Sequence, residues 1–179
     1  MPDSLTDILD GCKRGERPSQ KRLYELYKDK MYVLCLRYSN SREDAQDVLQ
    51  EGFIKVFRDL HQYKGLGSFE GWVRKVMLNV ALQHLKQQKK MRFEADFGQW
   101  ENTLHAEEEV FDEEMVKTIL KIMHKMPTGF RTVLNLYVLE GYTHQQIAEE
   151  LGISVGTSKS QLNRAKEHLR KLVDKSLTR

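Results

Sequence analysis

The stretch GYTHQQIAEELGISVGTSKSQLNRAKEHL at residues 141–169 decides the fold of the C-terminal part of the chain. Thr143 is suited to cap a first short helix, and Gly152 to end it, because glycine enters a left-handed turn without steric cost. Ser154 is suited to cap a second helix, and Ala148 is small where the two helices cross. This pattern predicts a helix-turn-helix whose second helix enters a DNA major groove, with an ordinary helical hairpin as the alternative.

Charge is unevenly distributed along the 179 residues, although the formal net charge is only +3. The net charge is +6 for residues 1–93, −9 for residues 94–114 and +6 for residues 115–179. Two basic blocks joined by an acidic stretch predict two nucleic-acid-binding domains and a linker. We therefore expect a domain at 1–92, an acidic linker at 93–113 and a domain at 114–179.

Composition narrows the class of protein further. Only 3 prolines and 11 glycines are present, which favours helix. No apolar run approaches the roughly 20 residues that span a membrane, and the N-terminus lacks the layout of a signal peptide. We therefore expect a cytoplasmic protein without membrane insertion. Cys12 and Cys35 are expected to be reduced, and the scattered histidines predict no metal and no cofactor.

Apolar residues spaced by three and four predict helices throughout, without a strand pattern or an internal repeat. The predicted buried faces include Leu26 in the second helix and Trp72, Val76 and Leu85 in the fourth. The fold class is therefore all-α, in two small helical domains. The predicted helices span residues 4–11, 18 to about 39, 42–61, 69–90, 116 to about 127 and 128–140, followed by the helix-turn-helix.

The helix at residues 42–61 carries a polar face opposite its apolar stripe. Its members are Asp44, Asp47, Gln50 and Glu51, at spacings of three and four. A row of acids in an otherwise basic domain is unsuited to DNA. Taken alone, such a charge run is most often a solvated helix face. The alternative is docking on a basic protein surface, where charge pairs fix register and speed encounter.

A glycine loop, YKGLGS at residues 63–68, and the helix after it predict a nucleic-acid site. The polar face of that helix combines cations with Asn79, and an amide among cations suits base edges while the cations hold phosphates. Tyr63, Phe69 and Trp72 around the loop are suited to stack on, or enclose, an unstacked base. For Trp72 a place in the core is favoured, because it falls in the apolar stripe, and stacking on a base is the alternative.

The order of these features resembles the extracytoplasmic-function group of RNA polymerase sigma factors, in the sigma-70 family. The resemblance runs from DAQDVLQEGF through WVRKVMLNVALQHLK to YTHQQIAEELGISVGTSKSQLNRAKEHL. It implies a protein of regions 2 and 4 that is not an enzyme and needs no cofactor. Such a protein binds core RNA polymerase, recognises −10 and −35 promoter elements, assists DNA melting and is commonly held by an anti-sigma factor.

The resemblance also assigns roles to individual residues. Region 2 docks on the clamp helices of the β′ subunit through Asp44, Asp47, Gln50 and Glu51. Region 2 recognises and melts the −10 element through Tyr63, Lys64, Ser68, Phe69, Arg74, Lys75, Asn79 and Lys86. Region 4, which also contacts the β flap, reads the −35 element through Thr143, Ser154, Gly156, Thr157, Lys159, Ser160, Asn163 and Arg164.

Three positions depart from the family pattern. Ser158 stands where a β-branched residue is common, Gln161 where an arginine is common, and Gln83 where an acid is common. The glutamine at 161 predicts the loss of a phosphate or guanine contact, and Ser158 predicts thinner packing between the two helices.

Two other classes of protein remain as alternatives. One is a helix-turn-helix regulator that binds promoters as a dimer and without polymerase, although its receiver domain would need a βα pattern. The other is an enzyme, which the lack of a phosphate loop, a nucleophile elbow or a metal set disfavours.

Overall fold

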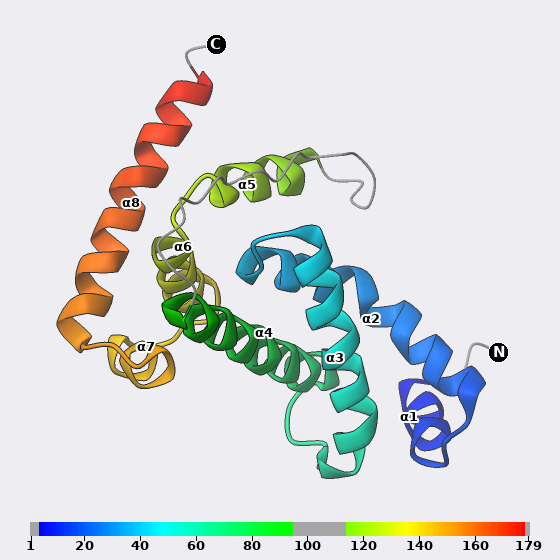
Figure 1. The fold of residues 1–179 in the computed structure, drawn as a ribbon. Helices are drawn as coiled ribbons and strands as arrows, with labels where there is room; N and C mark the ends of the chain where they lie inside the picture. The colour runs from blue at the N-terminus through cyan, green and yellow to red at the C-terminus, as the bar shows by residue number, and fades with distance from the viewer. Residues whose placement is uncertain (1–3, 95–113, 178–179) are drawn as a thin grey trace. The chain divides into compact units, whose positions relative to one another are not determined.

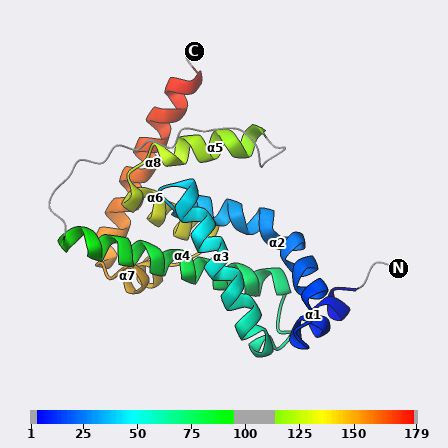
Figure 2. The same cartoon turned by 45° about the vertical axis from the view of Figure 1, so that its right-hand side comes forward.

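A computed structural model describes residues 4–94 and 114–177, and these residues are helical with no strand (Figures 1 and 2). The chain divides into two compact units, residues 1–85 and 86–179. The first unit contains α1 (Leu5–Lys13), α2 (Arg17–Tyr38), α3 (Arg42–Asp59), the short 3-10 helix η1 (Leu60–Gln62) and most of α4 (Phe69–Glu94). The second contains α5 (Glu114–His124), α6 (Thr128–Leu134), the π-helix η2 (Asn135–Leu139), α7 (His144–Leu151) and α8 (Val155–Leu177). The all-α prediction is confirmed.

Local signals set where the helices of the first unit begin. Ser4 caps α1 through a capping box with Asp7, and the Ser41 hydroxyl accepts a hydrogen bond from the Asp44 backbone N–H at 3.0 Å. Pro18 lies in the first turn of α2, where its missing N–H has no intrahelical partner to lose. The predicted start of the third helix is confirmed at Arg42.

The core of the first unit forms where α2 packs on α1 and α3, and where α3 meets α4. Its fully buried side chains include Leu23, Leu34 and Val48. Gly52 lets α3 approach α4 closely, because an added Cβ would overlap the sulfur of Met77. Packing of this density holds the helices in one arrangement.

Several residues predicted to be buried are less buried than expected, among them the half-buried Tyr27 and Phe57. Leu26 is 53% exposed, so the prediction that it belongs to the core is wrong. Trp72, Val76 and Leu85 are only half-buried. Helical spacing identifies the apolar face of a helix, but how much of that face is covered depends on the neighbouring helices.

In the second unit the predicted helix-turn-helix is confirmed. Thr143 caps α7 through a capping box with Gln146, and Ser154 accepts a hydrogen bond from the Thr157 backbone N–H at 3.0 Å. Gly152 ends α7 in the left-handed conformation, with φ 64° and ψ 39°. The turn therefore has the chemistry that its sequence indicated.

The predicted single helix over residues 128–140 is wrong in its second half. An α-helix ends at Leu134 and continues as the π-helix Asn135–Leu139. The wider π-helix ends in the consecutive exposed side chains Tyr137, Val138 and Leu139. The predicted acidic linker at 93–113 lies, apart from the end of α4, outside the described residues.

Candidate polymerase and promoter interfaces

The acidic face of α3 is presented to solvent along one side of the helix. Asp47, Gln50 and Glu51 are exposed. Asp44 is half-buried, and its carboxylate lies 3.7 Å from Nε2 of His84 on α4. The structure therefore groups three of the four predicted docking residues on an open surface and turns the fourth toward α4.

Ile54 was missed by the sequence analysis and extends this face. It lies one helical turn beyond Gln50 and Glu51, and its side chain is 66% exposed. Ile54 does not share the helical spacing of the buried residues of α3. An apolar residue outside that spacing is the sequence feature that could have identified it. In a protein interface, such an apolar side chain adds buried contact area inside a polar rim.

The glycine loop between η1 and α4 is braced by aromatic side chains. The Tyr63 hydroxyl donates a hydrogen bond to the Gly67 carbonyl at 2.9 Å. The Tyr63 ring lies 5.1 Å from the Phe69 ring and 5.8 Å from the Trp72 ring, measured between centroids. Phe69 is only 3% exposed, so it supports the loop from beneath and is not open to a base.

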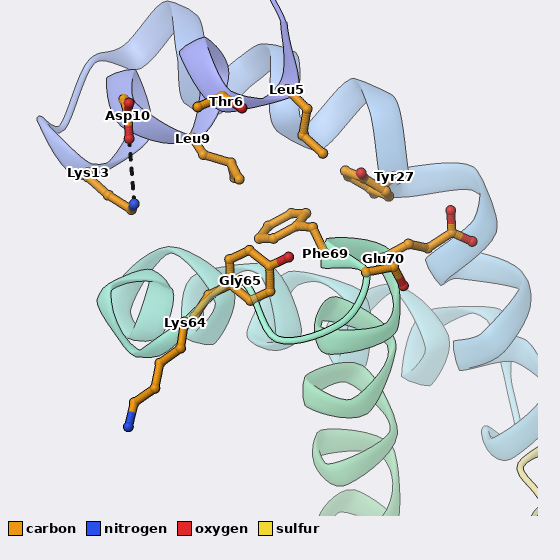
Figure 3. Close-up of a pocket in the computed structure, with 12 residues that line it drawn as sticks. Leu5, Thr6, Leu9, Asp10, Lys13, Tyr27, Lys64, Gly65, Phe69 and Glu70 are labelled. Carbon is orange, nitrogen blue, oxygen red and sulfur yellow. Dashed lines mark ion pairs between the residues drawn. The ribbon is translucent and has the colours of Figure 1, made fainter.

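A groove of about 780 Å³ lies between α1, α2 and this loop (Figure 3). Tyr27 and Tyr63 contribute rings to it, and burial, with a smaller effect from Glu70, raises the pKa of Tyr27, so the phenol stays neutral. Two of its acids are paired: Asp10 lies 3.5 Å from Lys13, and Glu70 lies 2.8 Å from Lys30. The remaining lining residues are Leu5, Thr6, Leu9, Lys64, Gly65, Ser68 and Phe69.

The polar face of α4 is exposed as the sequence indicated. Lys75, Asn79 and Lys86 are exposed, whereas Arg74 is half-buried. The exposed Ser68 accepts a hydrogen bond from the Gly71 backbone N–H at 3.1 Å and so caps the start of α4. The face combines cations with an amide, which is the combination that binds phosphates and base edges.

The helix-turn-helix is held together by a buried polar contact that the sequence did not predict. Ser158 is completely buried, and its Oγ lies 2.9 Å from Nδ1 of His144 on α7. The imidazole also stacks on the Tyr137 ring, with centroids 4.7 Å apart and planes at 23°. The serine therefore links α7 to α8 and does not simply leave thinner packing between them.

The residues predicted to face the −35 element fall into two groups: three at the N-terminal ends of α7 and α8, and five along the exposed side of α8. Thr143 and Ser154 are exposed caps, and the half-buried Thr157 bonds to Ser154 through its hydroxyl at 2.8 Å. The other five are exposed along the first turns of α8, namely Gly156, Lys159, Ser160, Asn163 and Arg164.

Gln161 does not lie on this exposed side of α8. It is half-buried, and a Cβ added at Gly129 of α6 would stand 3.3 Å from its Oε1. Position 161 therefore packs against α6, and the predicted loss of a DNA contact there stays a prediction.

Helix α8 packs on α6, and α6 carries a buried arginine, Arg131. Arg131 is 1% exposed, and its guanidinium donates a hydrogen bond to Nδ1 of His124 at 3.1 Å. Burial lowers the pKa of Arg131 to about 10, so it stays charged at neutral pH. Burial, reinforced by the guanidinium, lowers the pKa of His124 to about 4. The imidazole is therefore neutral at neutral pH, and its Nδ1 can accept the hydrogen bond from Arg131.

The part of the chain that the structure describes contains no group of three or more His, Cys, Asp or Glu side chains suited to a metal ion. Within the same residues, no helix combines the length and apolar character needed to cross a membrane.

Comparison with protein families gives two matches, one in each part of the chain. Residues 23–91 match the family described as Sigma-70 region 2, and residues 117–169 match Sigma-70, region 4. The first match contains the acidic face and the glycine loop, and the second contains the helix-turn-helix.

Curated relatives carry the same assignment. The ECF RNA polymerase sigma factor SigE of Mycolicibacterium smegmatis is 30% identical over 170 residues, which cover 92% of this chain and 66% of the relative. The ECF RNA polymerase sigma-E factor of Haemophilus influenzae is 28% identical, covering 93% of this chain and 95% of the relative. A solved structure of the sigma factor RpoE with the anti-sigma factor NepR, from Bartonella quintana, has a similar fold. Its TM-score is 0.58 at 16% identity, covering 86% of this chain and 96% of that one.

The chain therefore belongs to the sigma-70 family of RNA polymerase sigma factors, in its extracytoplasmic-function group. It is not an enzyme. It binds core RNA polymerase and promoter DNA, and it directs the initiation of transcription at promoters.

Proposed function

We propose that three surfaces of this sigma factor divide its work. The exposed acids of α3, Asp47 and Glu51, with Gln50 between them, dock on the basic clamp helices of the β′ subunit. Ile54 adds apolar contact at the end of the same face. The observation that carries the proposal is that the exposed acids lie on α3, while the exposed Lys75, Asn79 and Lys86 lie on α4. One helix is suited to a cationic protein and the other to DNA.

The glycine loop and the exposed face of α4 take the −10 element. Lys64, Lys75 and Lys86 are suited to phosphates, and Asn79 to a base edge. Tyr63 offers a half-exposed ring to an unstacked base, and Ser68 and Phe69 hold the loop in place. Arg74 is half-buried and belongs at the margin of this surface.

The start of α8 takes the −35 element in the major groove. Lys159, Ser160 and Asn163 are exposed on the first turns, where a recognition helix meets base edges. Gly156 and the hydroxyls of Thr143, Ser154 and Thr157 are near helix N-termini, which favour phosphate, and Arg164 follows one turn later as a phosphate contact.

The domain limits and partners complete the proposal. Region 2 occupies residues 1–92, an acidic linker 93–113 and region 4 residues 114–179. Region 4 also meets the β flap of the polymerase, for which the exposed side chains of η2 are suited. The protein works in the cytoplasm, where its polymerase is. An anti-sigma factor controls it, since the sigma factor RpoE in a similar solved structure is bound by the anti-sigma factor NepR.

The test is reconstitution with bacterial core RNA polymerase. The purified chain should co-elute with core enzyme in size exclusion, and the complex should initiate transcription at specific promoters. The chain alone should bind the same promoters poorly. Tight promoter binding by the chain alone, with no complex with core enzyme, would instead indicate a conventional helix-turn-helix regulator.

A further inference from the structure

Leu66, at the tip of the glycine loop, is an apolar side chain that the fold leaves almost entirely in water. It is 86% exposed, more than any other large apolar side chain whose burial the structure describes. It is absent from the lining of the neighbouring groove, although Lys64, Gly65 and Ser68 belong to it. The side chain therefore points away from the space beside its own loop.

The backbone around Leu66 holds it at this tip. Gly65 has φ 75° and Gly67 has φ 86°, a region that other residues adopt only with strain. A Cβ added at either glycine would meet nothing within 4 Å. The two glycines are therefore needed for the turn of the chain and not for space, and the turn presents the residue between them.

Contacts within the loop restrain the backbone that carries Leu66. The C-terminal arm of the loop is fixed by the hydrogen bond from the Tyr63 hydroxyl to the Gly67 carbonyl. The Tyr63 ring rests on the buried Phe69, and Phe69 in turn lies 5.6 Å from Trp72. Ordering a flexible loop on binding would cost free energy, and the contacts already present in this loop reduce that cost.

We propose that Leu66 is an apolar wedge that inserts between bases of the −10 element and separates them as the duplex opens. Proteins that kink or unstack DNA insert leucine and similar side chains between base steps, which buries their apolar surface against the base faces. Lys64, two residues away, would hold a phosphate beside the wedge. The inference rests on the proposed −10 role of this loop and adds the residue that performs the separation.

The experiment compares opening of a duplex with binding of DNA that is already open. The probe is a promoter sequence that the wild-type holoenzyme selects from a random-sequence library. Two linear templates are prepared from it: one fully paired, and one with mismatched bases at the −10 element. Leu66→Ser should lower the rate at which the duplex opens about tenfold. The reactivity of unpaired thymines toward permanganate measures this rate. Binding of the mismatched template should stay within about twofold of wild type.

Two matched variants separate the wedge from a general effect of removing leucine. Leu66→Met keeps an apolar side chain at the tip and should open the duplex at close to the wild-type rate. Leu26→Ser removes another exposed leucine of the same unit, on α2, and should change neither measurement. All three variants should bind core polymerase as wild type does.

The alternative outcomes are distinct. Opening at the wild-type rate by Leu66→Ser would overturn the wedge, as would an equal loss on duplex and mismatched templates. Loss of core binding by Leu66→Ser would overturn it in favour of a protein contact. If the wild-type chain and core polymerase select no promoter at all, the proposed function falls and the wedge falls with it.

Discussion

At the scale of single residues, Ser158 shows how one side chain sets the chemistry of a helix pair. A β-branched residue at this position would only fill space between the helices, whereas a buried hydroxyl also needs a hydrogen-bond partner. His144, at the start of α7, supplies that partner at 2.9 Å. The stacked Tyr137 ring then fixes the plane of the imidazole. The two helices are therefore joined by a directional contact in place of a purely apolar one.

Removal of this contact should be measurable. Ser158→Ala is expected to lower the free energy of unfolding by about 1 kcal/mol, the usual net worth of such a hydrogen bond. Urea unfolding followed by circular dichroism would measure it. In a double-mutant cycle, His144→Ala should cost less in the Ser158→Ala background than in wild type. Strict additivity of the two changes would show that the contact does not stabilise the fold.

His124 should make the second unit sensitive to acid. Its pKa is about 4 in the folded protein and about 6.5 in the unfolded chain, so between these values the unfolded state binds more protons. Stability from the neutral imidazole is therefore complete above about pH 6.5 and is lost as the pH falls toward 4. By pH 4.5 the loss should reach about 2 kcal/mol.

This pH dependence can be assigned to one residue. His124→Gln keeps an acceptor for Arg131 but cannot be protonated, so its unfolding free energy should decline less between pH 7 and pH 4.5. The same slope in both proteins would exclude His124 as the source. An NMR titration of the imidazole, expected near 4, gives an independent check.

At the scale of helices, the sequence predicts where a helix begins or ends better than it predicts which of its side chains are buried by neighbouring helices. Ser41, Thr143 and Gly152 act on the backbone within a few residues, so their effects are readable locally. Leu26 was misplaced, and the packing of Gln161 against α6 was not predicted, because both depend on a neighbouring helix that is distant in sequence. The same reason explains the candidate sites: their faces follow from helical spacing, but the burial of Phe69 and the His144–Ser158 contact follow from tertiary packing.

The acidic face of α3 can be tested as a unit. Asp47→Arg together with Glu51→Arg should abolish binding to core RNA polymerase, because the face would then repel a basic partner. Both side chains are exposed, so circular dichroism should remain native. The control is Glu149→Arg with Glu167→Arg, an equal charge change on exposed positions of the second unit. If the α3 variant keeps its affinity for core enzyme, this face does not dock.

The start of α8 can be tested by comparing two lysines of the same helix. Lys159→Ala should weaken holoenzyme binding to −35 duplex DNA and lower the slope of affinity against salt by about one unit. Lys166 is also exposed but lies about two turns further along α8, so Lys166→Ala should leave the slope close to wild type. Equal slopes for wild type and Lys159→Ala would remove Lys159 from the DNA interface.

At the scale of the whole molecule, two DNA-reading units on one chain should act together. Once one unit is bound, the other is held near its element, which raises its effective concentration without any new contact. This holds only while both elements lie on the same side of the duplex. The distance and the helical phase between the elements therefore become part of what the protein recognises.

Promoter spacing tests this coupling. Insertion of about five base pairs between the −10 and −35 elements rotates one against the other by half a helical turn. With this insertion, transcription by the holoenzyme should fall at least tenfold. A template with an insertion of about ten base pairs restores the helical phase but not the distance between the elements, and so separates the two effects. Run-off transcription from the three templates would measure the effect. Equal activity from all three would mean that one unit alone selects the promoter.

The two cysteines have a practical consequence for such experiments. Cys12 and Cys35 are both buried, and burial raises the pKa of the Cys35 thiol to about 12. Thiolate is the form that reacts with maleimides, so neither native thiol should compete for a dye in the folded protein. A single Leu26→Cys or Glu149→Cys change, at an exposed position outside the proposed interfaces, would then accept one fluorophore. The wild-type chain therefore needs no prior removal of cysteines before promoter opening is followed by fluorescence in real time.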